Sequence, residues 1–135
     1  MLTKLVNIIE KTELDASTVS LRNDGIIQLD MREIEREVSL EDVKAITSAL
    51  KKLGNGKRFP VLILVKRFNP ISKEASEYSA SEEAGIYTIA DAIVISNFAI
   101  RIASNFYIKM FKPVRPTKMF GSEEKAVEWL KTLLE

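Results

Sequence analysis

The chain has 135 residues, of which 46% are hydrophobic and 29% are charged, so one ordinary core and a single domain over residues 1–135 are expected. Its net charge of +1 gives no general field to attract nucleic acid, whose binding depends on neutralising phosphates. We therefore expect no nucleic-acid partner, and a charged partner would have to meet a local patch.

The sequence shows no membrane span and no export signal. Its longest apolar region, residues 93–103, contains Arg101 and falls short of the ~20 apolar residues that cross a bilayer. The first nine residues lead to Glu10 without the small-residue cleavage site of a signal peptide. These patterns predict a cytoplasmic protein without a transmembrane segment.

The chain contains no cysteine and no histidine. This composition removes thiolate nucleophiles, zinc sites with nitrogen or sulfur ligands, and triads that need imidazole. Glu82, Glu83 and Asp91 are conceivable as paired carboxylates, but the loop between them fixes no geometry and no nucleophile lies nearby in sequence. We therefore expect no enzyme, and hence no catalytic residue, metal site or cofactor.

The N-terminal third predicts a hairpin. Residues 1–16 are left without an assignment, because their apolar spacing fits a short helix or an extended edge almost equally. Residues 17–22 and 26–31 alternate apolar and polar side chains on either side of Asp24-Gly25, a dipeptide typical of tight hairpin turns. An antiparallel hairpin with one face on the core is expected.

A helix and a buried strand follow the hairpin. Ser39 and Asp42 resemble a capping box, an apolar stripe follows them, and Gly54 is expected to end the helix in the left-handed conformation. Residues 61–65 are apolar on both faces, which indicates a strand inside a covered sheet. A right-handed crossover should make this strand parallel to the hairpin strand before it.

The second half predicts two more strand–helix units. Ser72 should begin a shallow helix over residues 73–81, and residues 89–95 form a second buried strand in which Asp91 requires a partner. The next helix should run from residue 96 or 97 to about residue 110. Its larger apolar side chains, among them Phe98, Ile102 and Phe106, are expected to face inward.

The chain should close with a short strand and a helix. Pro113 and Pro116 forbid continuation of the preceding helix. Residues 117–120 then form the last strand, and Ser122 caps the last helix. The fold class is thus α/β, with a β-hairpin followed by βα units, a mixed and mostly parallel sheet of four or five strands, and about four helices.

This order of elements resembles the SpoIIAA-like fold of STAS domains, found in bacterial anti-sigma-factor antagonists and sulphate-transporter tails. The hairpin, the strand leading to Ser72 and the ending Lys118-Met-Phe-Gly-Ser-Glu-Glu-Lys-Ala-Val-Glu-Trp-Leu carry the resemblance. Tyr78-Ser-Ala-Ser-Glu-Glu and Tyr87-Thr-Ile-Ala-Asp-Ala-Ile-Val look more closely like a group of uncharacterised stand-alone bacterial STAS-like proteins. The resemblance spans about Ser17 to the C-terminus and implies the fold without implying a particular activity.

The resemblance also points to Ser72. In phosphorylated antagonists, a serine at the start of the helix after the central strand is the switch, and Ser72 holds the matching place without the preceding Asp or the following Gly of that motif. A phosphate would suit the free N–H groups of a helix start, but capping alone also accounts for a serine there. Asn69, Lys73 and Tyr78 lie in the same predicted partner-binding or regulatory surface.

Basic residues gather near the end of the chain. Lys112, Arg115 and Lys118 lie on a proline-stiffened loop, where they form a candidate patch for an anion or an acidic partner. Complementarity to helix dipoles alone produces the same arrangement. Both readings stay open.

Two functions follow from these features. The first is a regulatory or protein-interaction module, working through residues 67–72 and the helix after them, with an unknown protein partner and as a homodimer. The second is binding of a small apolar or lipid-like ligand, if the thin apolar face of the Ser72 helix, with Tyr78, opens over the sheet. The second function requires a cavity of at least a few hundred Å³.

Overall fold

The computed structural model describes residues 5–67 and 69–134, which build a six-stranded sheet and five helices. The strands lie in sequence order, β1-β2-β3-β4-β5-β6. The pairs β1–β2 and β2–β3 are antiparallel, and the pairs β3–β4, β4–β5 and β5–β6 are parallel. Their bounds are Ile8–Glu13 (β1), Ser17–Arg22 (β2), Ile27–Met31 (β3), Phe59–Val65 (β4), Thr88–Val94 (β5) and Thr117–Phe120 (β6).

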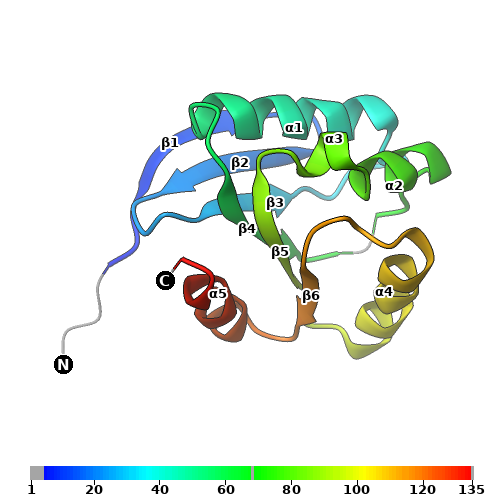
Figure 1. Ribbon diagram of the computed structural model, residues 1–135. Helices are drawn as coiled ribbons and strands as arrows, with labels where there is room; N and C mark the ends of the chain where they lie inside the picture. Colours follow the sequence, from blue (N-terminus) through cyan, green and yellow to red (C-terminus); the bar gives the residue numbers. More distant parts are fainter. Residues whose placement is uncertain (1–4, 68, 135) are drawn as a thin grey trace.

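The helices form two layers around the sheet. α1, α2 and α3 cover one face and α5 lies against the other, while α4 lies near β6 at the edge of the molecule (Figure 1). The predicted α/β class is confirmed, with slightly more strands and helices than expected. The bounds are Leu40–Leu53 (α1), Lys73–Ser79 (α2), Glu82–Gly85 (α3), Phe98–Phe111 (α4) and Glu123–Thr132 (α5).

The antiparallel half contains the predicted hairpin and one strand more. Val19 of β2 pairs with Leu29 of β3, and Gly25 in the turn has a φ of 84°, which glycine adopts at low cost. The segment left without an assignment supplies β1, where Thr12 pairs with Val19. Residues 1–4 of that segment lie outside the described residues.

The two buried runs form the centre of the parallel half, as predicted. Leu62 of β4 pairs with Ala92 of β5, and both are fully buried. Together with Ala126 and Leu130 they belong to the core under α5. The core on the opposite face packs Leu29 and other apolar residues of β2 to β4 against α1.

The start of α1 confirms the capping box, but its end corrects the prediction for Gly54. The backbone N–H of Asp42 donates to Ser39 Oγ at 3.2 Å, and that of Ser39 donates to Asp42 Oδ2 at 2.8 Å. Gly54 has a φ of −86° and is not left-handed. Glycine is required there for space, because a Cβ at Gly54 would lie 2.9 Å from the ring of Phe59.

The helix expected over residues 73–81 ends at Ser79 (α2), and the short α3 follows it after Ser81. Ser81 caps α3, with its Oγ accepting from the backbone N–H of Ala84 at 3.3 Å. Its hydroxyl also donates to the carbonyl of Tyr78. Serine competes with the helical backbone through such local bonds, so the chain turns at this position.

The orientation predicted for α4 is wrong. Phe98, Ile102 and Phe106 were expected to face inward, but they are exposed. The side of α4 that meets the rest of the protein carries Ile100, Ala103 and Ser104. Both sides of this helix bear apolar residues, so their spacing alone does not identify the buried side.

Candidate functional site

A largely apolar cavity of about 430 Å³ lies between the helical layer and the sheet. This volume falls in the range of ordinary ligand sites, roughly 300 to 1,000 Å³. Strands β3 to β6 form its floor, and α1, the α2–α3 region and α4 form its walls. Residues that represent each of these parts are Leu29, Ile46, Ile63, Ala84, Ile100 and Met119.

The alternation of side chains along the strands explains why the cavity is apolar. Val61, Ile63 and Val65 of β4 face it, while Leu62 and Leu64 between them pack toward α5. On β5, Ile93 faces the cavity in the same way. A strand that is apolar on both faces thus packs into the core under α5 with one face, and with the other it contributes both to the core under α1 and to the cavity lining.

Some of the positions on α3 and α4 that border this space carry small side chains. Ala84 of α3 and Ala103 and Ser104 of α4 line the cavity. Short side chains at these positions leave the space above β4 and β5 open. The hollow follows from the residue types on the walls as well as from the placement of the helices.

An ion pair lies in the cavity wall beneath α3 and α4. Arg115 Nε donates to Asp91 Oδ2 at 2.7 Å, and both side chains are largely buried, with 12% and 7% of their surface exposed. The partner that a buried Asp91 requires is therefore Arg115. A Cβ at Gly85 would lie 2.8 Å from Arg115 Cδ, so glycine at that position gives the arginine its path.

Burial raises the pKa of Asp91, while the charge and the hydrogen bond of Arg115 act in the opposite direction. Arg115 also has a donor to spare, because its Nη1 atom is buried without a hydrogen-bond partner among the described residues. A buried donor without a partner is costly. Arg115 is thus the one charged group in the cavity wall with an unused buried donor in the described part of the chain.

Ser72 caps α2 as predicted, and its local partners are all structural. Its Oγ accepts from the backbone N–H of Ala75 at 3.0 Å. Its own N–H donates to the carbonyl of Val38 at 3.0 Å, beside a parallel bridge between Val38 and Ile71. The residue fixes the start of α2 against the loop before α1.

The other residues of the predicted regulatory surface each make separate contacts. Asn69 donates to the carbonyl of Arg32 and lines the cavity. Lys73 is exposed, and its Nζ atom lies 3.8 Å from Oε1 of Glu77 in the next turn. Tyr78 is half-buried and packs near Val38 and Val43, with Lys44 above its ring.

The three residues of the predicted anion patch do not share one surface. Lys112 ends α4 and is exposed, while Arg115 is buried with Asp91. The Nζ atom of Lys118 lies 5.4 Å from the ring centroid of Trp129, on the α5 side of the sheet. The three residues are close in the sequence. Their side chains are separated because Arg115 turns to Asp91 and Lys118 lies on the α5 face of β6.

The lining of the cavity is the feature that sequence reasoning missed. The sequence indicated that a buried Asp91 requires a partner, but the identity of that partner follows from the strand register, in which Asp91 pairs with Thr117, two residues after Arg115. No comparable signal revealed which side of α4 faces inward. Among residues 5–67 and 69–134, no three carboxylates or other metal-binding side chains group in a way that could hold a metal ion.

The comparison with solved structures identifies the fold. The chain is similar to an uncharacterised protein of the DUF3478 family, with a SpoIIAA-like fold, from Shewanella loihica PV-4. The two are 15% identical, with a TM-score of 0.57, and the match covers 96% of this chain and 98% of that one. The fold is therefore SpoIIAA-like, as the STAS-like resemblance implied.

A family model gives the membership of the chain. The model described as a domain of unknown function, DUF7793, matches residues 19–134, and the chain belongs to that family. A protein of unknown function from Arthrobacter sp. FB24 is also similar, at 23% identity over 84% of this chain and 97% of that one, with a TM-score of 0.30. No curated protein matches the chain.

Proposed function

We propose that the chain is a non-catalytic module that binds a small, mainly apolar molecule in the cavity between the sheet and α1 to α4. The observation that carries the proposal is the cavity itself, about 430 Å³ in volume and lined mostly by aliphatic side chains. Pockets of this size and lining are the usual sites of small-molecule ligands. A core that only needed to be stable would gain by filling such a space.

The polar groups of the wall suggest the form of the ligand. Arg115 provides a buried donor without a partner, and Thr88 lines the same part of the cavity. Asp91 already balances the charge of Arg115, so a neutral oxygen acceptor, such as a carbonyl or ester, suits this place better than a second anion. We expect an apolar molecule with one such acceptor at the Arg115 end.

A neutral, fluorescent apolar probe, N-phenyl-1-naphthylamine, tests the site directly. The wild type should bind the probe saturably. The double variant Ile63→Trp with Ala103→Phe, which places large rings in the cavity, should bind it at least about tenfold more weakly, because apolar contact area supplies most of the affinity. Equal binding by two folded proteins would place the probe elsewhere and contradict the proposal.

A regulatory role through a protein partner is the second candidate. One observation favours it: Asn69 and Ile71 line the cavity and lie within three residues of Ser72, the N-cap of α2. Occupation of the cavity would then bear on the surface that carries Ser72, Lys73 and Tyr78. Self-association into a homodimer stays a prediction in this scheme.

A further inference from the structure

The outer side of α4 is an apolar stripe that nothing in the described chain covers. Phe98, Ile102, Phe106 and Met110 recur every four residues, and each exposes between 46% and 71% of its surface. Isolated exposed apolar residues are ordinary, but a row of large ones on one helix marks an interaction surface. Val114, just beyond the helix, is also exposed, at 58%.

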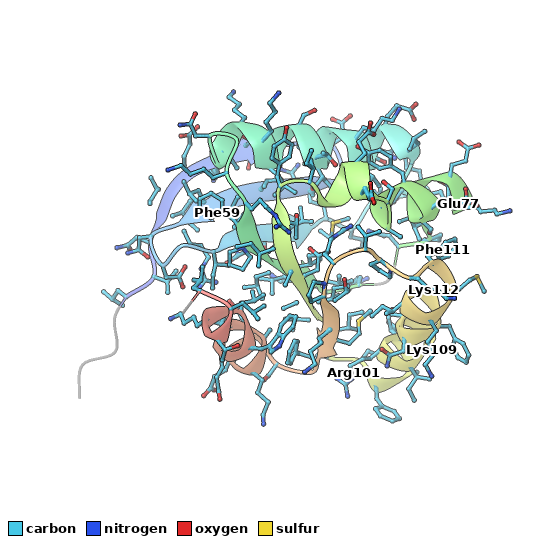
Figure 2. All side chains as sticks on the ribbon, in the orientation of Figure 1. Phe59, Glu77, Arg101, Lys109, Phe111 and Lys112 are labelled. Atoms are coloured by element: carbon cyan, nitrogen blue, oxygen red, sulfur yellow. The ribbon has the colours of Figure 1, made fainter. Side chains whose placement is uncertain are left out.

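The charged residues of α4 and its C-terminal cap are all cationic. Residues 92–122 contain no Asp or Glu but include five cationic residues, of which Arg101, Lys109 and Lys112 belong to α4 or its C-terminal cap. Figure 2 shows these three side chains along α4, whereas Glu77 lies on the neighbouring α2. The guanidinium of Arg101 is 5.6 Å from the ring centroid of Phe98, so cation and apolar stripe are directly adjacent.

The apolar stripe and its adjacent cations favour one of two partners, a second copy of the chain or a lipid surface. A second copy of the chain, packed about a two-fold axis on the same stripe, would bring the cations of one α4 toward the cations of the other, and residues 92–122 offer no acidic residue to balance them. An anionic lipid surface offers acyl chains to the aromatic rings and phosphates to the cations. We propose that α4 docks the protein on the surface of an anionic membrane.

In this arrangement α4 lies in the plane of the interface. Phe98, Phe106 and Met110 enter the boundary between headgroups and acyl chains, and Lys109 extends its ammonium group toward the phosphates. The other side of the same helix, with Ile100 and Ala103, lines the cavity. Docking therefore brings the membrane against one wall of the cavity, although the docking surface itself does not depend on a ligand.

Vesicle flotation with the full chain tests this proposal. Wild-type protein should float with vesicles of phosphatidylcholine and phosphatidylglycerol, and much less with phosphatidylcholine alone. The variant Phe98→Ser with Phe106→Ser should bind the anionic vesicles at least about tenfold more weakly, because two large apolar contacts are lost. Lys109→Glu with Lys112→Glu should abolish the preference for the anionic lipid.

Ile86→Ser is the matched control, because Ile86 is 56% exposed but belongs to the end of α3 and not to α4. It should float like the wild type. Sedimentation velocity on the same proteins identifies the other occupant: a wild-type dimer that becomes monomeric in the Phe98→Ser, Phe106→Ser variant, without flotation of either protein, would assign the stripe to a second copy and overturn the proposal. Equal flotation of all variants would overturn it as well. These readouts use no cavity ligand, so they are independent of the function proposed above.

Discussion

The carboxylate of Asp91 is held in a buried wall of the cavity by a single cation, Arg115, 2.7 Å away. Removing one member of a buried pair costs more than the pair itself contributes, because the remaining charge has no solvent. The contact also connects β5 to the loop before β6. The pair therefore fixes the geometry of the cavity wall as well as its charge.

Arg115→Met should lower the free energy of unfolding by about 3 kcal/mol near neutral pH, because it leaves Asp91 buried without its cation. Adding Asp91→Leu should recover most of that loss. Urea denaturation of the two variants and the wild type measures both effects. A small effect of Arg115→Met, below about 1 kcal/mol, would mean that Asp91 is solvated and the wall is open.

The pH dependence of the same variant has a defined sign. Burial raises the pKa of Asp91 above its ordinary value, and Arg115 opposes that rise, so the Arg115→Met variant should raise it further. A raised carboxyl pKa means that the folded state prefers the protonated form. The variant should accordingly be least destabilised near pH 4, and its deficit should grow as pH rises through the folded-state pKa. A deficit that shrinks with rising pH would contradict this assignment.

Asp42 shows the opposite behaviour. A side-chain hydrogen bond from Arg36, aided by the backbone and hydroxyl of Ser39, lowers the pKa of Asp42 from 3.8 to about 2. This group stabilises the fold above its ordinary pKa and loses that contribution as pH falls toward 2. Asp42→Asn should cost about 1 kcal/mol near neutral pH, as for loss of a helix cap, and should flatten the unfolding profile between those two values.

Glu41→Gln, at an exposed neighbouring position in the same helical turn, is the control for Asp42→Asn. Circular dichroism during acid titration follows both proteins. The control should keep the wild-type acid profile, because its carboxylate is not a member of the capping box. Equal profiles for the two variants would show that the capping box carries no pH-dependent stability.

Adjacent residues of one strand offer a test at the scale of elements. Ile63 and Leu62 are isomers on β4, but Ile63 faces the cavity and Leu62 is fully buried under α5. Ile63→Phe should change the free energy of unfolding by less than about 1 kcal/mol, because the cavity accepts the larger ring, whereas Leu62→Phe should cost about 1 to 3 kcal/mol through overpacking. Thermal unfolding measures the difference, and equal costs would mean that both faces are packed alike.

Ser72 provides the test of the α2 surface. Ser72→Ala should lose about 1 kcal/mol of stability with the cap, and Ser72→Asp should keep most of it because aspartate also caps. Pull-downs from the native host should recover different partners for Ser72→Asp and Ser72→Ala if the surface is switched by phosphate. Identical partner sets would leave Ser72 with a capping role only.

The sequence predicts most of the helices and strands because each pattern of apolar and turn residues fits only one kind of element. Residues 61–65 are apolar on both faces and therefore lie inside a covered sheet, and Asp24-Gly25 fits a hairpin turn. The orientation of α4 was not predictable in this way, since either side of it could be buried. The break at Ser81 was also missed, because one hydroxyl competing for backbone bonds leaves little trace in a pattern of apolar residues.

In the molecule as a whole, the size of the cavity depends on distances between helices and strands, which cannot be derived from the sequence. The volume between sheet and helices is set by how far α4 lies from β4 and β5, and no single residue encodes that distance. We predicted Arg115 as a surface cation, but it is part of the cavity wall, because β6 brings the loop before it against Asp91.

In the described part of the chain, none of the helices has the length and apolar character needed to span a membrane.

Native mass spectrometry of the protein, equilibrated with a lipid extract of its own host and then separated from free lipid, tests the cavity proposal most directly. We expect a bound molecule of defined mass on the wild type. The same adduct should be absent from the folded Ile63→Trp, Ala103→Phe variant. A wild type without an adduct, or the same adduct on both proteins, would contradict it.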